Sequence, residues 1–219
     1  MKAATVKKLI AAFVFAPATL LAAETDTPLD AAPIDGRDLV SLQSGARTFV
    51  NYCLGCHGLQ YMRYNRLTDL AITEAQVRDN LMFSSEKVGD TMKIAMSAKD
   101  GKAWFGVPPP DLSVIARSRG ADWLYTYLRT FHRDAKTATG WNNKVFPNAA
   151  MPHVLWKVQE EQSAVQYDTT VRDLVNFLVY AGEPSAQSRK SIGIVVLFVL
   201  GVLFIFAYMM KKAFWKDVR

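Results

Sequence analysis

Two cysteines, separated by two residues and followed at once by a histidine, constrain this chain more than any other feature. They lie in the sequence Cys53-Leu54-Gly55-Cys56-His57, and the 219 residues contain no other cysteine. C-x-x-C-H is the attachment motif of a c-type haem, because two thiols one helical turn apart can both add to the vinyl groups of the macrocycle. The adjacent histidine then lies beside the iron as its proximal ligand. The motif therefore predicts one covalently bound haem c.

The same cysteine pair has two other interpretations. A C-x-x-C pair can be a thiol–disulfide redox site, or one half of a zinc site. The sequence has no second cysteine pair to complete a zinc site, and no βαβ pattern of the thioredoxin kind surrounds the motif. The N-terminal export signal described below also favours haem, which is attached outside the cytoplasm. We therefore prefer the haem interpretation.

The sixth coordination position of the iron needs a second ligand. The candidates in the central part of the chain are Met62, Met82, Met92, Met96, Met151, His132 and His153. Met151 stands apart because Pro152 favours extended backbone before it, and the two preceding alanines would allow close approach to a flat ring. A thioether is a soft ligand that favours ferrous iron. Met151 is the expected distal ligand, and His153 is its nearest rival.

The N-terminal residues 1–23 have the layout of a secretory signal peptide. Three lysines precede an uncharged apolar stretch that ends at Ala22 and Ala23, where a signal peptidase could cut. Cleavage after Ala23 is the expectation, and an uncleaved N-terminal anchor is the alternative. In either case residues 24–188 are expected to form an exported domain.

A second apolar segment lies near the C-terminus. Residues 191–210 are twenty residues without a charge, and at the helical rise they span about 30 Å, the thickness of the hydrocarbon core. Basic residues flank both ends, so the charge rule alone does not orient the helix. The predicted export signal orients it, because it places the preceding domain outside the cytoplasm. We expect a transmembrane helix with its flanks over 189–212 and a cytoplasmic tail over 213–219.

The net charge of +6 comes from the two ends of the chain. Residues 24–188 hold 17 basic and 19 acidic residues, so the exported domain is slightly acidic. Nucleic-acid binding therefore has no support. A mildly acidic domain instead suits a basic protein partner, through steering more than through affinity.

Apolar spacing and turn residues indicate an all-α domain with long loops and no internal repeat. Three consecutive prolines place residues 100–111 in a loop, and Asp111 is expected to cap a following helix that begins at Leu112. Residues 137–156 are also rich in turn-forming residues. The expected helices are 38–52, 73–80, 112–119, 121–131 and 171–181.

The spacing around the motif resembles the class I cytochrome c fold. Gly45 and Phe49 precede Cys53 at four-residue intervals, and a late helix carries Leu174 and Phe177. In that fold the first and last helices cross, and the glycine permits close approach to the aromatic residue.

A more specific resemblance is to the cytochrome c1 family, the haem c subunits of cytochrome bc1 complexes. It rests on three further features of the sequence. These are Pro109-Pro110-Asp111-Leu112-Ser113 with Arg117 and Arg119, the Ala-Met-Pro segment around Met151, and the basic C-terminal anchor.

The resemblance implies a role for each site residue. Cys53 and Cys56 would hold the haem by thioethers, with His57 and Met151 as the axial iron ligands. The carbonyl of Pro110 would accept a hydrogen bond from the proximal imidazole. Arg119 would pair with a haem propionate, although a solvated cation at a helix end is the alternative. No catalytic residue is expected.

The resemblance further implies electron transfer within a ubiquinol–cytochrome c oxidoreductase. The haem would take one electron from the Rieske iron–sulfur protein and pass it to a cytochrome c, with the anchor beside cytochrome b. The expected location is the bacterial inner membrane, with the haem domain in the periplasm and the C-terminus in the cytoplasm. Two alternatives are a free-standing membrane-tethered carrier and a haem enzyme such as a peroxidase, for which Met151 leaves no open iron position.

Overall fold

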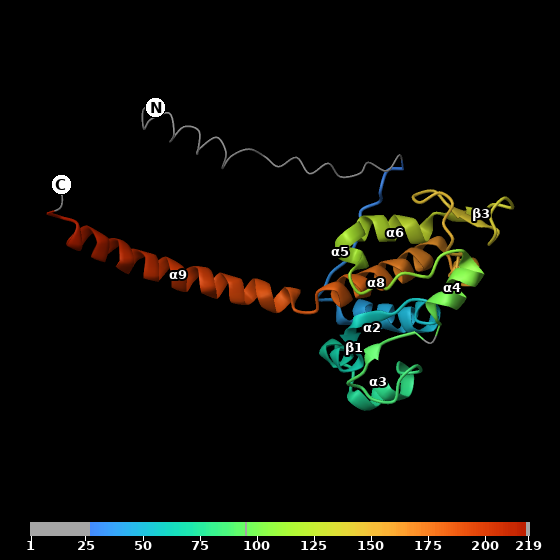
Figure 1. Ribbon diagram of the computed structural model, residues 1–219, viewed down its shortest axis with the longest axis horizontal. Coiled ribbons are helices and arrows are strands. Elements are labelled where there is room, and N and C mark those ends of the chain that lie inside the picture. The colour runs from blue at the N-terminus through green and yellow to red at the C-terminus, as the bar shows by residue number, and fades with distance from the viewer. Residues whose placement is uncertain (1–26, 95, 218–219) are drawn as a thin grey trace.

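The computed structural model describes residues 27–94 and 96–217, so the predicted signal peptide lies outside the described residues. A helical domain carries one long helix that extends away from it (Figure 1). The helices are α2 (Leu39–Thr48), η1 (Phe49–Cys53), η2 (Tyr64–Leu70), α3 (Glu74–Asn80), α4 (Ala98–Phe105), α5 (Ile115–Arg119), α6 (Ala121–Arg129), α7 (Trp156–Glu161), α8 (Ala164–Gly182) and α9 (Ala186–Phe214). The helical fold class is confirmed.

Short strands, which the sequence analysis did not predict, form two antiparallel pairs in the described part of the chain. β1 (Leu59–Arg63) pairs with β2 (Thr91–Met92), and β3 (Phe131–Arg133) pairs with β4 (Trp141–Asn143). Strands of two to five residues are too short to give a readable alternation of apolar and polar side chains.

The core is centred on the crossing of α2 and α8, which lie side by side in Figure 1. Phe49 and Phe177 are fully buried there, with ring centroids 5.7 Å apart. Gly45 is the point of closest approach, because a Cβ atom built on it would lie 2.7 Å from the Cβ of Phe177 and closer still to the carbonyl oxygen of Asp173. This is the glycine-dependent helix crossing that the class I resemblance implies.

The ends of these two helices differ from the expected bounds for identifiable reasons. Asp38 caps α2 by accepting the N–H of Ser41. The end of the expected helix is a π-helical turn, in which Leu54 N–H donates to Phe49 O at 2.9 Å. α8 begins seven residues before the predicted position 171, because Ser163 and Gln166 form a capping box.

The segment around the three prolines is partly helical, which corrects the prediction of a loop over 100–111. Ser97 caps α4 by accepting the N–H of Asp100, and Gly106 ends the helix with a φ of 79°. The prolines at 108–110 follow outside the helix, as their missing N–H groups require. α4 packs closely on them, since a Cβ on Gly101 would meet Pro109 Cδ at 2.7 Å.

α9 extends away from the helical domain (Figure 1). It has 29 residues and is apolar and exposed along its length, so its length and composition allow it to cross a membrane. The helix includes the segment 191–210 that the sequence analysis assigned to the bilayer.

Candidate haem site

The C-x-x-C-H motif follows directly from the π-helical turn at the end of α2. The N–H groups of Cys56 and His57 donate to Cys53 O at 3.0 and 2.8 Å, which keeps the three residues on one turn. Cys53 is buried, Cys56 is partly buried, and neither forms a disulfide. The turn therefore presents both sulfurs and the imidazole together, as haem attachment requires.

The electrostatics of the two thiols disfavour the redox interpretation. Burial raises the pKa of the Cys53 thiol to about 12, and burial also raises the pKa of Cys56. Reactive C-x-x-C pairs have the opposite property, a thiol pKa lowered by their surroundings. Within the described residues no group of three His, Cys, Asp or Glu side chains is placed to hold a metal ion.

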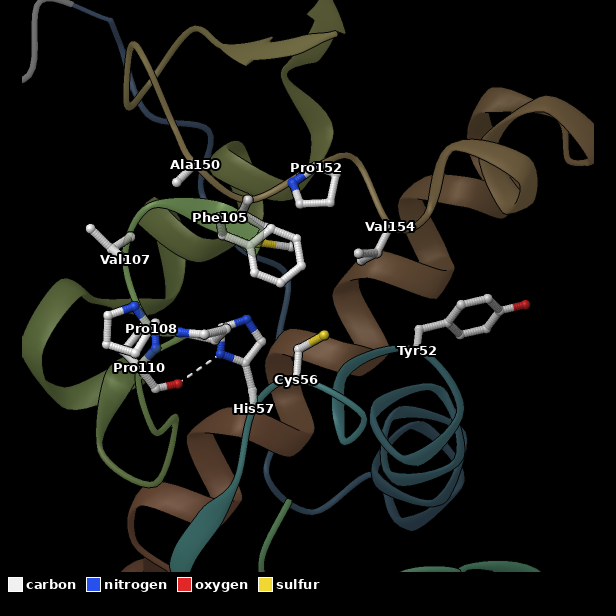
Figure 2. A pocket seen from close by; sticks show the side chains of 12 residues that line it. Tyr52, Cys56, His57, Phe105, Val107, Pro108, Pro110, Ala150, Pro152 and Val154 are labelled. Atoms are coloured by element: carbon white, nitrogen blue, oxygen red, sulfur yellow. Dashed lines mark hydrogen bonds between the residues drawn. The ribbon is translucent and has the colours of Figure 1, made fainter. Parts of the chain in front are cut away.

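His57 is held by the proline-rich segment. Its Nδ1 lies 2.7 Å from the carbonyl oxygen of Pro110, as the dashed line in Figure 2 shows. A carbonyl can only accept, so Nδ1 carries the proton and Nε2 keeps its lone pair. Burial lowers the pKa of His57, although the Pro110 bond and the Asp111 charge act in the other direction. The imidazole is therefore neutral, in the form that binds iron.

Asp111 does not cap a helix, which corrects the prediction from its position. α5 begins at Ile115 without a side-chain cap. The two carboxylate oxygens of Asp111 instead accept the N–H groups of Gln60 and Ser113, each at 2.9 Å. The carboxylate thus joins the proline-rich segment to the strand that follows the haem motif.

Two adjoining apolar cavities, of about 90 and 260 Å³, lie between His57 and the segment that carries Met151. Both are lined by His57 and Met151 together with Val107, Pro110 and Ala150. Figure 2 shows His57 on one side of the smaller cavity and the Ala150 to Pro152 segment on the facing side, with Phe105 between them. A flat apolar macrocycle fits this lining, and the cysteines and the imidazole beside it match the chemistry of haem c attachment.

The structure favours Met151 over His153 as the candidate distal ligand. His153 is only 3% exposed, and its ring stacks on Phe131 with centroids 5.0 Å apart. Its Nε2 lies 2.7 Å from the Gln159 side-chain oxygen, so that nitrogen already has a partner. His153 is therefore a satisfied core residue.

The remaining candidates lie outside the linings of both cavities. Met62, Met82 and Met92 are buried in the core, and His132 is exposed. Met151 is consequently the methionine that the fold brings to His57.

Arg119 lines the larger cavity at the end of α5. Its guanidinium carbon lies 5.2 Å from the ring centroid of Trp123. No acidic side chain in the described part of the chain pairs with it. Its predicted partner, a haem propionate, remains a prediction.

Tyr127, which sequence reasoning missed, also reaches the site. Its hydroxyl donates to Met151 Sδ at 3.6 Å, and its ring stacks on Trp123 with centroids 4.8 Å apart. Burial raises the pKa of this phenol to about 12, so it remains a hydrogen-bond donor. The one signal in the sequence is that Tyr127 follows Trp123 by four residues, which places both side chains on the same face of α6.

The family model for the cytochrome C1 family matches residues 31–103 and 85–218, which together cover most of the chain. The chain belongs to the cytochrome c1 family. It is 47% identical to cytochrome c1 of Allochromatium vinosum, over 97% of this chain and 99% of that protein. It is 27% identical to cytochrome c1 of Rhodospirillum rubrum, over 83% of each. A Nitrosomonas europaea protein named ammonia monooxygenase gamma subunit is 47% identical, over 98% of this chain and 99% of its own length.

As a cytochrome c1, the chain carries a covalently bound haem c and is an electron-transfer subunit. It is a membrane-anchored protein, with α9 as the candidate anchor. The family assignment agrees with the geometry of the site, in which two potential iron ligands line both adjoining apolar cavities and each cavity is also lined by one of the cysteines.

Replacing Tyr127 by phenylalanine is expected to lower the haem reduction potential while the protein remains folded. The hydroxyl withdraws electron density from Met151 Sδ, which disfavours ferric iron more than ferrous iron. A hydrogen bond of about 1 kcal/mol corresponds to a few tens of millivolts in a one-electron couple. Spectroelectrochemical titration measures the shift. The matched control is Tyr167→Phe, which removes a hydroxyl that donates to Leu128 O at 2.9 Å; equal potentials in both variants would contradict the expectation.

Proposed function

We propose that this cytochrome c1 works in a quinol–cytochrome c oxidoreductase of the bc1 type, between the Rieske iron–sulfur protein and a cytochrome c. The observation that carries the proposal is that His57 and Met151 both line two adjoining apolar cavities, of which one is lined also by Cys56 and the other by Cys53. If His57 and Met151 hold the iron, they would leave no position for a substrate. Such a site suits electron transfer and disfavours peroxidase chemistry.

A haem bound here supplies a one-electron couple at the iron. Cys53 and Cys56 hold the cofactor by thioether bonds. His57 provides the basic nitrogen, whose tautomer is fixed by the Pro110 carbonyl. Met151 provides the soft thioether that favours the ferrous state. The apolar lining excludes water and thereby limits the change in solvation when the charge of the site changes.

Arg119 pairs with a haem propionate in this proposal. Support comes from its position in the cavity lining and from the lack of an acidic partner among the described residues. A planar guanidinium matches a carboxylate with two parallel hydrogen bonds. The contact with Trp123 orients the guanidinium at the cavity wall.

The proposal places the haem domain in the periplasm, with α9 crossing the inner membrane beside cytochrome b. Basic residues flank both ends of the apolar segment of α9, with Lys211 and Lys212 in the last turn, so the charge rule alone does not orient the helix. The export signal read from residues 1–23 supports the periplasmic orientation of the haem domain. Release of the haem domain by external protease from spheroplasts, with the C-terminus protected, is the expected result.

Purification of the intact protein tests the assignment to a complex. A tag on the exported domain and mild detergent are expected to recover haem c together with haem b and the electron paramagnetic resonance signal of a Rieske cluster. Haem c alone, under conditions that preserve other membrane complexes, would instead indicate a free-standing tethered carrier. Recovery with monooxygenase subunits would favour the role named for the Nitrosomonas europaea relative.

A further inference from the structure

The hydrogen bond that fixes the His57 tautomer depends on where the Pro110 carbonyl lies. Proline contributes no N–H to secondary structure, so Pro110 cannot anchor itself through its own nitrogen. The neighbouring prolines have the same limitation. Packing of α4 on Pro109 limits the prolines from one side, and the backbone N–H groups that can anchor the segment come from the residues that follow Pro110.

Asp111 is the first of these residues, and it makes two connections. Its Oδ2 accepts the N–H of Gln60 at 2.9 Å, three residues after His57. Its Oδ1 accepts the N–H of Ser113 at 2.9 Å, which closes a local turn. One carboxylate therefore both shapes the proline-rich segment and attaches it to the segment that carries the imidazole.

The surrounding contacts show that this junction is closely fitted. Leu112 N–H donates to Gly58 O at 2.9 Å, next to the His57 peptide. A Cβ atom on Gly58 would lie 3.1 Å from Asp111 Oδ2, so the carboxylate occupies the space that the glycine leaves open. The backbone on both sides of the His57–Pro110 bond is thus held by Asp111 and its immediate neighbours.

We infer that Asp111 is a positioning residue for His57, acting through the Pro110 carbonyl. The inference rests on the proposed role of His57 as an iron ligand. A carbonyl held against Nδ1–H makes the imidazole a more basic ligand, and a more basic ligand stabilises ferric iron. Loss of the carboxylate should therefore free the imidazole proton and raise the reduction potential.

The first measurement follows the imidazole proton itself. The chain contains three histidines, so selective ¹⁵N-histidine labelling of the ferrous full-length protein gives few resonances. Asp111→Ala is expected to speed solvent exchange of the His57 Nδ1 proton about tenfold, the loss of roughly one hydrogen bond. Asp111→Asn keeps one acceptor oxygen and is expected to give an intermediate rate.

The matched control is Ser113→Ala. The Ser113 hydroxyl accepts the N–H of Tyr61 at 3.1 Å, at the same junction but beyond Asp111. The control is expected to weaken the junction and leave the His57 proton and the potential unchanged. The potential of Asp111→Ala is expected to rise by up to about 59 mV, which corresponds to tenfold in the equilibrium constant for reduction.

Four outcomes decide the inference. A wild-type exchange rate and potential in Asp111→Ala would overturn it, and so would equal changes in Ser113→Ala. If His57→Ala kept a low-spin haem spectrum, His57 would not be the ligand, and both the proposed function of the site and the inference would fall. A changed proton exchange and potential in the Asp111 variants alone supports it.

Discussion

Replacing Met151 by leucine is expected to lower the haem reduction potential by on the order of 100 mV, a modest part of the ~0.8 V range that axial ligands command. The thioether favours ferrous iron, whereas the water or hydroxide that would take its place favours ferric iron. The reduced variant should also bind carbon monoxide readily, because a position on the iron becomes accessible. Redox titration and optical spectra with carbon monoxide measure both effects.

Two controls distinguish the effect of losing the iron ligand from a general disturbance of the fold. Met92→Leu makes the same change at a fully buried position outside the cavity linings, so the potential should stay at the wild-type value. His153→Phe removes the rival ligand and keeps an aromatic ring against Phe131. A wild-type potential without carbon monoxide binding in Met151→Leu, together with ready carbon monoxide binding in His153→Phe, would reverse the assignment.

The largest expected effect on stability comes from Gly45→Ala. The new methyl group would lie 2.7 Å from the Cβ of Phe177 and would overlap the carbonyl oxygen of Asp173. To make room for the methyl group, the backbones of α2 and α8 would have to move apart, and this would open the core between the two helices. Overpacking of this kind is expected to cost about 3 kcal/mol, the upper end of the usual range, and to lower the unfolding midpoint by roughly 6–12 °C.

Gly89→Ala is the matched control, because a Cβ atom at that position meets no atom within 4 Å. Thermal unfolding of the three holoproteins, followed by circular dichroism, gives the comparison. A Gly45→Ala midpoint within a few degrees of the Gly89→Ala midpoint would show that the helix crossing tolerates a side chain. The fold would then not depend on the glycine in the way described.

The predicted haem-attachment residues could be proposed from the sequence because their chemistry is local. Cys53, Cys56 and His57 lie within one turn, and their spacing together with the predicted export signal favours haem c over the other interpretations of the cysteine pair. The Met151 expectation used backbone preference around Pro152, and the cavity linings agree with it. The Pro110 contact came from family resemblance, and the structure shows it at 2.7 Å.

The supporting residues were not readable, because their contacts join distant parts of the chain. Asp111 stands shortly before a helix and has the appearance of a cap, but its partner Gln60 lies 51 positions earlier. Tyr127 has the pattern of an ordinary core residue, and its contact with Met151 depends on how α6 meets a loop 24 residues later. The strands were missed for a similar reason, since their pairing partners and not their short sequences define them.

α4 was not predicted from the sequence for a different reason. Three prolines dominated the interpretation of residues 100–111, although the capping serine and the C-terminal glycine lie outside the proline run. Helix propensity is a weak guide over eight residues, and the end signals decide such short helices. The Ser97 and Gly106 pair was the signal that could have identified this helix.

Quinol-driven reduction of the haem in the purified complex tests the central claim most directly. On addition of a ubiquinol analogue, the α-band of haem c is expected to appear within the turnover time of the complex, and removal of the Rieske protein should abolish it. The absence of reduction by quinol in a preparation whose haem c is fully reducible by dithionite would contradict the proposed place of this chain in electron transfer. Reduction that persisted without the Rieske protein would contradict the proposed donor.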